Sequence, residues 1–130
     1  MKKALLLTVL LASLGWASLA FAQGPMQQTK PSPADQARLA KLEKAYHAAK
    51  AALAKAPQSQ RAKNDFVTVG DAYAMESMTS PVLPPRVKYP QSLRVFREVL
   101  KVNPTDKTAK KWTDEMIRIY KSMGRPVPSG

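Results

Sequence analysis

The spacing of apolar residues is the feature that most limits what this chain can fold into. Between residues 33 and 123, apolar side chains recur every three or four positions in four stretches, and prolines stand between the stretches. Such a recurrence places apolar side chains on one face of an α-helix. No stretch alternates apolar and polar residues as a half-buried strand would. The sequence therefore predicts an all-α fold of about four helices, packed as antiparallel pairs.

The first predicted helix runs from Pro33 to Lys55, with Ser32 as its N-cap. Serine is a favourable cap, and proline suits the first helical position because its missing N–H would have no partner there. A narrow apolar stripe runs along this helix, formed by Leu39, Leu42, Tyr46, Ala49 and Leu53. The stripe indicates that one face of the helix packs on the rest of the domain.

The second predicted helix runs from Arg61 to Ser77, and one face carries Phe66, Val69, Gly70 and Tyr73. A glycine inside a helix costs about 1 kcal/mol relative to alanine. We expect the close approach of a neighbouring helix at Gly70 to compensate for this cost.

Residues 80–90, with the sequence SPVLPPRVKYP, contain four prolines. We expect this proline-rich segment to be an extended loop between the second and third helices. One interpretation is a loop that lays Val82, Leu83 and Val87 over the core. The other is a recognition segment, since long loops without secondary structure are often functional.

The third predicted helix runs from Gln91 to Asn103, and the fourth from Asp106 to Met123 with Thr105 as its cap. Apolar residues cover about half of the third helix, which indicates contact with more than one other helix. The fourth helix has one apolar face that we expect to be buried, formed by Ala109, Trp112, Met116, Ile119, Tyr120 and Met123.

The N-terminus has the three parts of a secretory signal peptide. Lys2-Lys3 is a basic start, residues 4–17 are uncharged and rich in leucine, and Ala20-Phe21-Ala22 is a small-x-small cleavage site. An uncleaved anchor is the alternative, because residues 4–22 are uncharged and just long enough to span a bilayer. The polar residues that follow favour cleavage after Ala22. We therefore expect an exported, periplasmic or extracellular protein of the bacterial envelope.

These patterns divide the chain into a signal peptide (1–22), a flexible lead (23–32), a helical domain (33–124) and a mobile tail (125–130). Gly124 fits the position just past a helix end, and Pro126 prevents the helix from resuming. The chain has no cysteine, so it lacks a disulfide to support its small core. Helix packing or a partner must provide the stability.

The chain is strongly basic, with 21 Lys and Arg against 9 Asp and Glu, a net charge of +12, or +10 without Lys2 and Lys3. On the fourth helix, four basic residues fall within about 40° of one line. They form a predicted basic ridge, which Asp114 interrupts: Lys107, Lys111, Arg118 and Lys121. The ridge predicts contact with a polyanion, such as anionic lipid headgroups, acidic envelope polymers or an acidic protein patch. The alternative is a solvated outer face.

The second and third helices resemble a tetratricopeptide repeat. The matching residues are Phe66, Val69-Gly70 and Tyr73 in the first helix of the pair, and Ser92, Phe96 and Pro104 in the second. About ten residues are inserted between Tyr73 and Ser92, where a standard repeat has a short turn. The first predicted helix would then belong to an incomplete preceding repeat, and the fourth would be a capping helix. An ordinary four-helix bundle with a chance match is the alternative.

The resemblance implies a protein-binding groove lined by the first helix of each pair. Its residues by position would be Asn64, Val67, Asp71, Ala74 and Met75. The family's clamp for C-terminal carboxylates uses Lys and Asn at such positions, and Val67 and Asp71 do not fit it. Repeat arrays usually need about three units to be stable alone. The shorter array here favours self-association or docking onto a larger partner.

Few residues in the chain suit catalysis. The chain has one histidine, His47, on a helix rich in Lys and Ala, and no cysteine for a zinc site. Its five glycines are scattered and form no phosphate-binding loop. Asp114 and Glu115 are adjacent, so on a helix their side chains point about 100° apart. The sequence predicts no enzyme, no cofactor and no metal site.

Two functions remain open. The first is an exported helical-repeat scaffold that binds an unidentified envelope protein or a second copy of itself. The second is a basic helical bundle that binds polyanions at a membrane surface, on an acidic polymer or on extracellular nucleic acid. Trp112 and Tyr120 lie on the apolar face, away from the basic ridge, and export separates the chain from the genome. Both points argue against intracellular nucleic acid as the partner.

Overall fold

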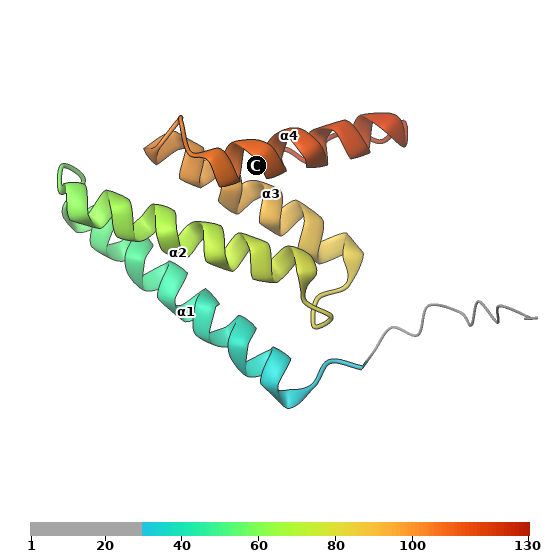
Figure 1. Cartoon of the computed structure of the whole chain (residues 1–130), viewed down its shortest axis with the longest axis horizontal. Coiled ribbons are helices and arrows are strands. Elements are labelled where there is room, and N and C mark those ends of the chain that lie inside the picture. The colour runs from blue at the N-terminus through green and yellow to red at the C-terminus, as the bar shows by residue number, and fades with distance from the viewer. Residues whose placement is uncertain (1–29) are drawn as a thin grey trace, which may run out of the picture.

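The computed structural model describes residues 30–130 and contains, within them, four α-helices and no strand. The helices are α1 (Pro33–Lys55), α2 (Gln60–Thr79), α3 (Pro85–Val102) and α4 (Lys107–Ser122) (Figure 1). The prediction of an all-α fold with four helices is confirmed. The predicted signal peptide and residues 23–29 of the predicted lead lie outside the described residues.

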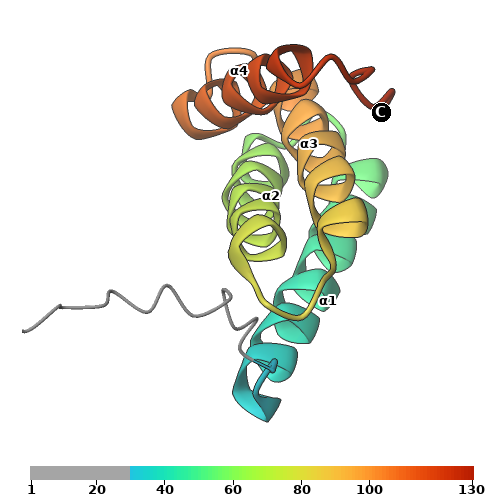
Figure 2. The same cartoon turned by 90° about the vertical axis from the view of Figure 1, so that its right-hand side faces the viewer.

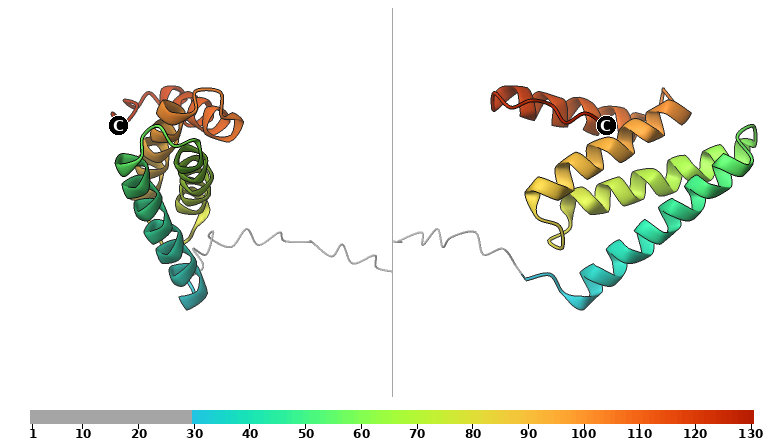
Figure 3. Two further views of the ribbon diagram at one scale, coloured as in Figure 1. Left: turned by 90° about the vertical axis from the view of Figure 1, so that its left-hand side faces the viewer. Right: turned by 180° about the vertical axis from the view of Figure 1, so that it is seen from behind.

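Each helix packs against the next one in the chain, so α2 contacts α1 and α3, and α3 contacts α2 and α4. Successive helices run in roughly opposite directions, which gives the antiparallel pairs that the sequence predicts (Figures 1 and 2). Figure 3 shows α1 and α4 at opposite edges of the molecule. Within residues 30–130, no helix combines the length and the apolar character that crossing a bilayer requires.

Polar side chains cap the starts of three helices, α1, α2 and α4. Ser32 caps α1 in a capping box, because its Oγ accepts from the Asp35 N–H and the Asp35 carboxylate accepts from the Ser32 N–H. Ser59 Oγ accepts from an N–H of α2. The cap of α4 is Asp106 and not the predicted Thr105: the Asp106 carboxylate accepts from the Ala109 N–H at 2.9 Å.

Gly124 ends α4, as the sequence predicts. Its φ of +63° is in the left-handed region, which glycine adopts without a steric penalty. The Gly124 N–H donates to the Lys121 carbonyl and the Arg125 N–H donates to the Tyr120 carbonyl, each at 3.0 Å. This pair of bonds is a Schellman motif, and it turns the chain back at Arg125.

The start of α3 corrects the prediction of a proline-rich loop over residues 80–90. Only residues 80–84 connect the two helices, and α3 begins at Pro85 and continues through Pro90. The prediction was wrong because it counted prolines without regard to their positions. α2 and α3 are therefore both longer than expected, and the turn between them is short.

The free-energy cost of each of these prolines depends on its position in the helix. Pro84 is the N-cap and Pro85 the first helical residue, where proline removes no intrahelical bond. Pro90 does remove one bond, and a proline inside a helix costs about 3 kcal/mol. The buried face of α3 offsets this cost, since it includes the fully buried side chains of Leu93, Val95, Phe96 and Val99.

The α2–α3 interface is closest at Gly70. A Cβ built on Gly70 would lie 2.7 Å from Val99 Cγ2 and 4.0 Å from Val95 Cγ1. A distance of 2.7 Å is shorter than carbon atoms tolerate, so a larger residue would force the helices to shift. The predicted close approach of a neighbouring helix at Gly70 is confirmed.

Aromatic rings fill the core between α1 and α2. Tyr46 of α1 stacks on Tyr73 of α2 with ring centroids 5.0 Å apart, and the Phe66 ring lies 5.9 Å from the Tyr46 ring. On α3, Phe96 is fully buried, and only 4% of Tyr73 is exposed. The predicted apolar stripe of α1 packs onto this core along its length, through Leu39, Leu42, Tyr46, Ala49 and Leu53.

Side-chain hydrogen bonds join α3 to both earlier helices. The Tyr46 hydroxyl donates to Glu98 Oε2, which also accepts from Lys50 Nζ at 3.0 Å. Burial opposes the charge on Glu98, but the hydrogen bonds from Tyr46 and Lys50 outweigh burial and lower the pKa of its carboxyl. Gln91 Nε2 donates to the Tyr73 hydroxyl at 2.7 Å. α3 thus contacts α1, α2 and α4, which confirms the prediction from its wide apolar face.

Residues 125–130, for which the sequence predicts a mobile tail, contact the core and form a hydrogen bond with α3. Val127 packs against the core, and the Pro128 carbonyl accepts from Arg97 Nη1 at 2.6 Å. After the turn at Gly124, the tail runs back beside α4, as Figure 3 shows.

Candidate functional site

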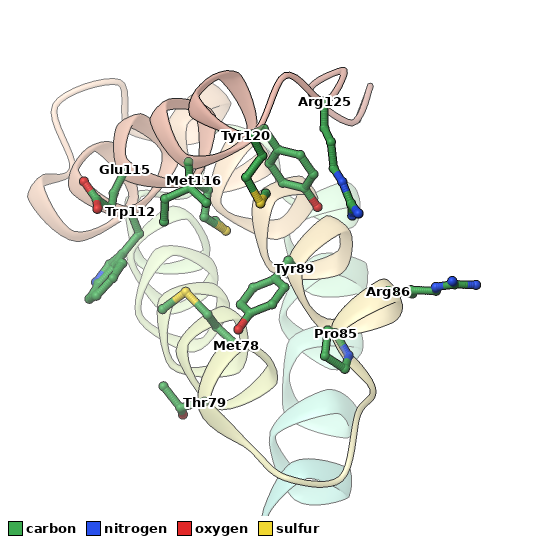
Figure 4. A pocket seen from close by; sticks show the side chains of 12 residues that line it. Met78, Thr79, Pro85, Arg86, Tyr89, Trp112, Glu115, Met116, Tyr120 and Arg125 are labelled. Carbon is green, nitrogen blue, oxygen red and sulfur yellow. The ribbon is translucent and has the colours of Figure 1, made fainter. Parts of the chain in front are cut away.

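A hollow of about 640 Å³ lies where the end of α2, the start of α3 and the second half of α4 meet. Ligand pockets commonly measure about 300–1,000 Å³. We call this hollow the apolar groove (Figure 4), and it is lined by Met78, Thr79, Pro85, Arg86, Tyr89, Trp112, Glu115, Met116, Ile119, Tyr120, Met123 and Arg125. Methionine and aromatic side chains dominate this lining, which suits the binding of an apolar surface.

The groove is open because the apolar face of α4 is longer than the surface that α3 covers. Ala109 near the start of α4 is fully buried, and Met116 just past its middle is 4% exposed. Ile119 in the last turn is 41% exposed, and Met123, which caps the end of the helix, is 52% exposed. The sequence predicts a buried position for Ile119 and Met123, and this prediction was wrong because no later helix covers them within residues 30–130.

Exposed apolar side chains concentrate at this groove. The large apolar residues exposed in the described chain are Val87, Tyr89, Ile119 and Met123. Three of the four line the groove, and Val87 lies in the same first turns of α3 as Tyr89. Clustered exposed apolar side chains mark interaction surfaces more often than scattered ones do.

Charged side chains stand at the two ends of the groove. Figure 4 shows Arg86 and Arg125 at one end, and Trp112 and Glu115 at the other. Glu115 is paired with Arg118, whose Nε lies 3.1 Å from Glu115 Oε2. The hydrogen bond from Arg118 lowers the pKa of the Glu115 carboxyl, so this carboxyl is ionised and already neutralised by its partner.

A pair of carboxyl groups joins α2 to the start of α4. Burial, a hydrogen bond with Asp106 and the charge of Asp106 together raise the pKa of Asp71 to about 7, and burial contributes most. Asp71 Oδ1 is buried and has no hydrogen-bond partner among the described residues. Two facing carboxyl groups share a proton more readily than they both ionise. This pair lies outside the lining of the groove.

The five groove residues predicted from the repeat resemblance lie on α2 but do not line the observed groove. Asn64 is exposed, Ala74 is buried, and the other three, Val67, Asp71 and Met75, are half-buried. Val67, Ala74 and Met75 belong to the apolar core or pack against it. The groove begins further along α2, at Met78 and Thr79.

All four residues of the predicted basic ridge are exposed on α4. Two of them border the apolar groove: Lys111 Nζ lies 5.1 Å from the centre of the Trp112 ring, and Arg118 pairs with Glu115. Asp114, which interrupts the ridge, is 2.9 Å from Lys110 Nζ. The ridge and the groove are therefore adjacent surfaces of the same helix.

The residues considered for chemistry are not gathered into a site. His47 is exposed on α1, with its ring 5.1 Å from the Tyr46 ring. Residues 30–130 contain no group of three or more His, Asp or Glu side chains positioned to hold a metal ion.

The contribution of α3 to the groove was not predicted from the sequence. Pro85, Arg86 and Tyr89 lie in the segment predicted as a loop, and the pattern gave no reason to place them beside α4. One signal was present: the apolar stripe of the fourth predicted helix is as long as the helix itself. A terminal helix with a full-length stripe needs a neighbour of equal length to cover it.

Comparison with known proteins gives no relative for this chain. No protein family, no curated protein and no solved structure matches it.

Proposed function

We propose that this protein is an exported protein-interaction module of the bacterial envelope, which binds a helical segment of another protein in the apolar groove. The observation that carries the proposal is the exposure of Tyr89, Ile119 and Met123 within one hollow of about 640 Å³. Burying such side chains against a partner is favourable by about 25 cal/mol per Å² of apolar surface. Binding would therefore cover three of the four large apolar side chains that are exposed on residues 30–130.

The shape and the lining of the groove favour a helix as the bound element. Two helices and the end of a third form its walls, and a convex rod fills a hollow of this kind. Methionine side chains adapt to the irregular surface of a bound helix, and the lining contains Met78, Met116 and Met123. A helical partner would present apolar residues at intervals of three and four, as the chain's own helices do.

A repeat of the tetratricopeptide kind is part of this proposal. The repeat pattern from Phe66 to Pro104 coincides with the α2–α3 pair, and Gly70, Tyr73 and Phe96 are buried in that pair. The segment between Tyr73 and Ser92, which includes the inserted residues, extends both helices. It carries five of the groove-lining residues: Met78, Thr79, Pro85, Arg86 and Tyr89. In this interpretation α4 caps the pair, and its second half is left for the partner.

Site-specific photo-cross-linking in intact envelopes tests the proposal. A photoreactive amino acid would replace Tyr89 or Met123 in the groove, and Lys44 on the exposed face of α1 as the matched control. We expect a discrete protein adduct from both groove positions, lost when Ile119→Gln is added, and no such adduct from position 44. Equal labelling from all three positions, or none from the groove, would contradict the proposal.

Polyanion binding by the basic ridge is the second candidate, supported by the exposure of Lys107, Lys111, Arg118 and Lys121. Charge-driven binding weakens steeply between low and moderate salt. If this function holds, replacing the four residues by Ser abolishes retention on an anionic matrix, whereas Ile119→Gln leaves retention unchanged. Retention that is independent of salt would reject it.

A further inference from the structure

We infer that the segment bound in the apolar groove is an amphipathic helix that carries acidic residues beside its apolar face. The inference rests on the proposed function, because it specifies the partner of the same groove. It is carried by the charges that border the groove and by the shape of the hollow.

Two arginines at one end of the groove are available to a ligand. Arg86 at the start of α3 and Arg125 after α4 both line the groove, and Figure 4 shows them at the same end. Neither forms an ion pair within residues 30–130. Guanidinium groups bind carboxylates with two parallel hydrogen bonds, so an acidic side chain is the natural partner for this end.

Two lysines border the aromatic part of the lining. Lys88 Nζ lies 5.3 Å from the centre of the Tyr89 ring, and Lys111 Nζ lies 5.1 Å from the centre of the Trp112 ring. Both rings line the groove, and Figure 4 shows Trp112 at the end opposite to the arginines. Positive charge therefore borders both ends of the apolar lining, and a ligand that carried basic residues there would be repelled.

The acidic residue of the lining does not offset these charges. Glu115 is bound by Arg118, at 3.1 Å between Arg118 Nε and Glu115 Oε2, so this pair contributes no net negative charge. The whole chain carries a net charge of +12. An acidic segment is thus complementary to the groove locally and to the chain as a whole.

The same observations count against two other occupants. A second copy of the chain would bring another basic surface, and like charges across an interface disfavour association. A lipid bilayer is flat on the scale of a few side chains, whereas Met78, Met116 and Tyr120 lie within a hollow between helices. A convex, acidic rod fits both the shape and the charge.

A display library of helical peptides tests this inference. Each peptide would have about 18 residues, with a constant apolar stripe and random polar residues beside it. The library would be selected on the purified, immobilised protein. We expect enrichment of Asp and Glu over Gln and Lys beside the stripe. The enriched acidic peptides should bind at least about fivefold more tightly than their Gln versions, a ratio in the range of two favourable surface charge contacts.

Matched variants show whether the preference is local to the groove. Arg86→Gln with Arg125→Gln should remove the preference for acidic over Gln peptides. Lys44→Gln with Arg61→Gln removes the same charge from exposed positions on α1 and α2, and should leave most of the preference intact. An equal loss in both double variants would overturn the inference, because the preference would then follow from net charge alone.

The remaining outcomes separate this inference from the proposed function. Selected peptides that need Ile119 but show no charge preference would overturn the inference and leave the protein-interaction proposal standing. If no peptide is enriched, and the protein instead binds vesicles of phosphatidylglycerol and phosphatidylethanolamine through Ile119 and Met123, both would fall.

Discussion

Single residues determine how closely the helices of this fold approach each other and which buried groups carry charge. Gly70 is the clearest case of close approach. Its missing side chain lets α2 approach α3 until Val99 occupies the space where a Cβ would be. Asp71, the next residue, is held against Asp106 and keeps its proton at unusually high pH. The two neighbours give two different predictions, one for packing and one for pH.

We predict that Gly70→Ala destabilises the protein by about 1–3 kcal/mol, although alanine favours helix formation by about 1 kcal/mol. The added Cβ would lie 2.7 Å from Val99 Cγ2 and would push the helices apart. Urea unfolding measures the change. In a double-mutant cycle, Gly70→Ala with Val99→Ala should cost less than the sum of the single changes. Strict additivity would show that the two residues are not in contact.

The carboxyl of Asp71 makes stability depend on pH. Because its folded pKa of about 7 lies above the ordinary value of 3.8, the unfolded chain releases this proton first as pH rises. The stability contributed by the protonated form is therefore full below about pH 4 and is lost as pH rises through about 7.

We predict that Asp71→Asn raises the melting temperature clearly at pH 8 and little near pH 4, since the amide cannot ionise and can donate to Asp106. Asp65→Asn is the matched control, because Asp65 is exposed on the same helix. Thermal unfolding at the two pH values measures both. A gain for Asp71→Asn that is the same at pH 4 and pH 8 would show that folding does not raise the pKa of Asp71.

At the scale of elements, the spacing of apolar residues predicted the bounds of the helices better than the number of prolines did. The bounds of α1, α2 and α4 lie within two residues of the predicted ones, because the period of 3.6 and the caps fix where a helix can begin and end. The start of α3 could not be predicted by counting prolines, because the cost of a proline depends on its position in the helix. The open groove could not be predicted either, since the cover over Ile119 depends on how far the neighbouring helices extend.

We predict that Pro90→Ala stabilises the protein by about 1 kcal/mol or more, because the new N–H can donate within α3. The gain is smaller than the full cost of a proline in a helix, since alanine also gives the unfolded chain more freedom. Pro85→Ala is the control and should give no gain, because Pro85 is the first helical residue. Unfolding in urea compares the two, and a loss of stability in Pro90→Ala would mean that residues 85–90 do not form helix.

At the scale of the whole molecule, stability and binding are expected to use different apolar residues. Phe96 and Val99 are fully buried and hold the helices together, whereas Ile119 and Met123 are about half exposed. Only the second pair is free to contact another molecule, and both of its members line the groove.

We predict that Ile119→Gln with Met123→Gln changes the free energy of unfolding by less than about 1 kcal/mol, as exposed positions usually do. The same double variant should lose the groove cross-link and the selected peptides. Met116→Gln is the contrasting change, since Met116 is 4% exposed and its loss should cost about 2 kcal/mol or more. A double variant that unfolds like Met116→Gln would place Ile119 and Met123 in the core and not at a binding surface.

Amide hydrogen exchange, with and without a selected helical peptide, tests most directly whether the groove is the binding site. The account predicts slower exchange on binding in residues 117–123 of α4 and in the first turns of α3, with α1 unchanged. Slower exchange confined to α1, or to the first turns of α4 around Lys107, with the groove segments unchanged, would contradict it.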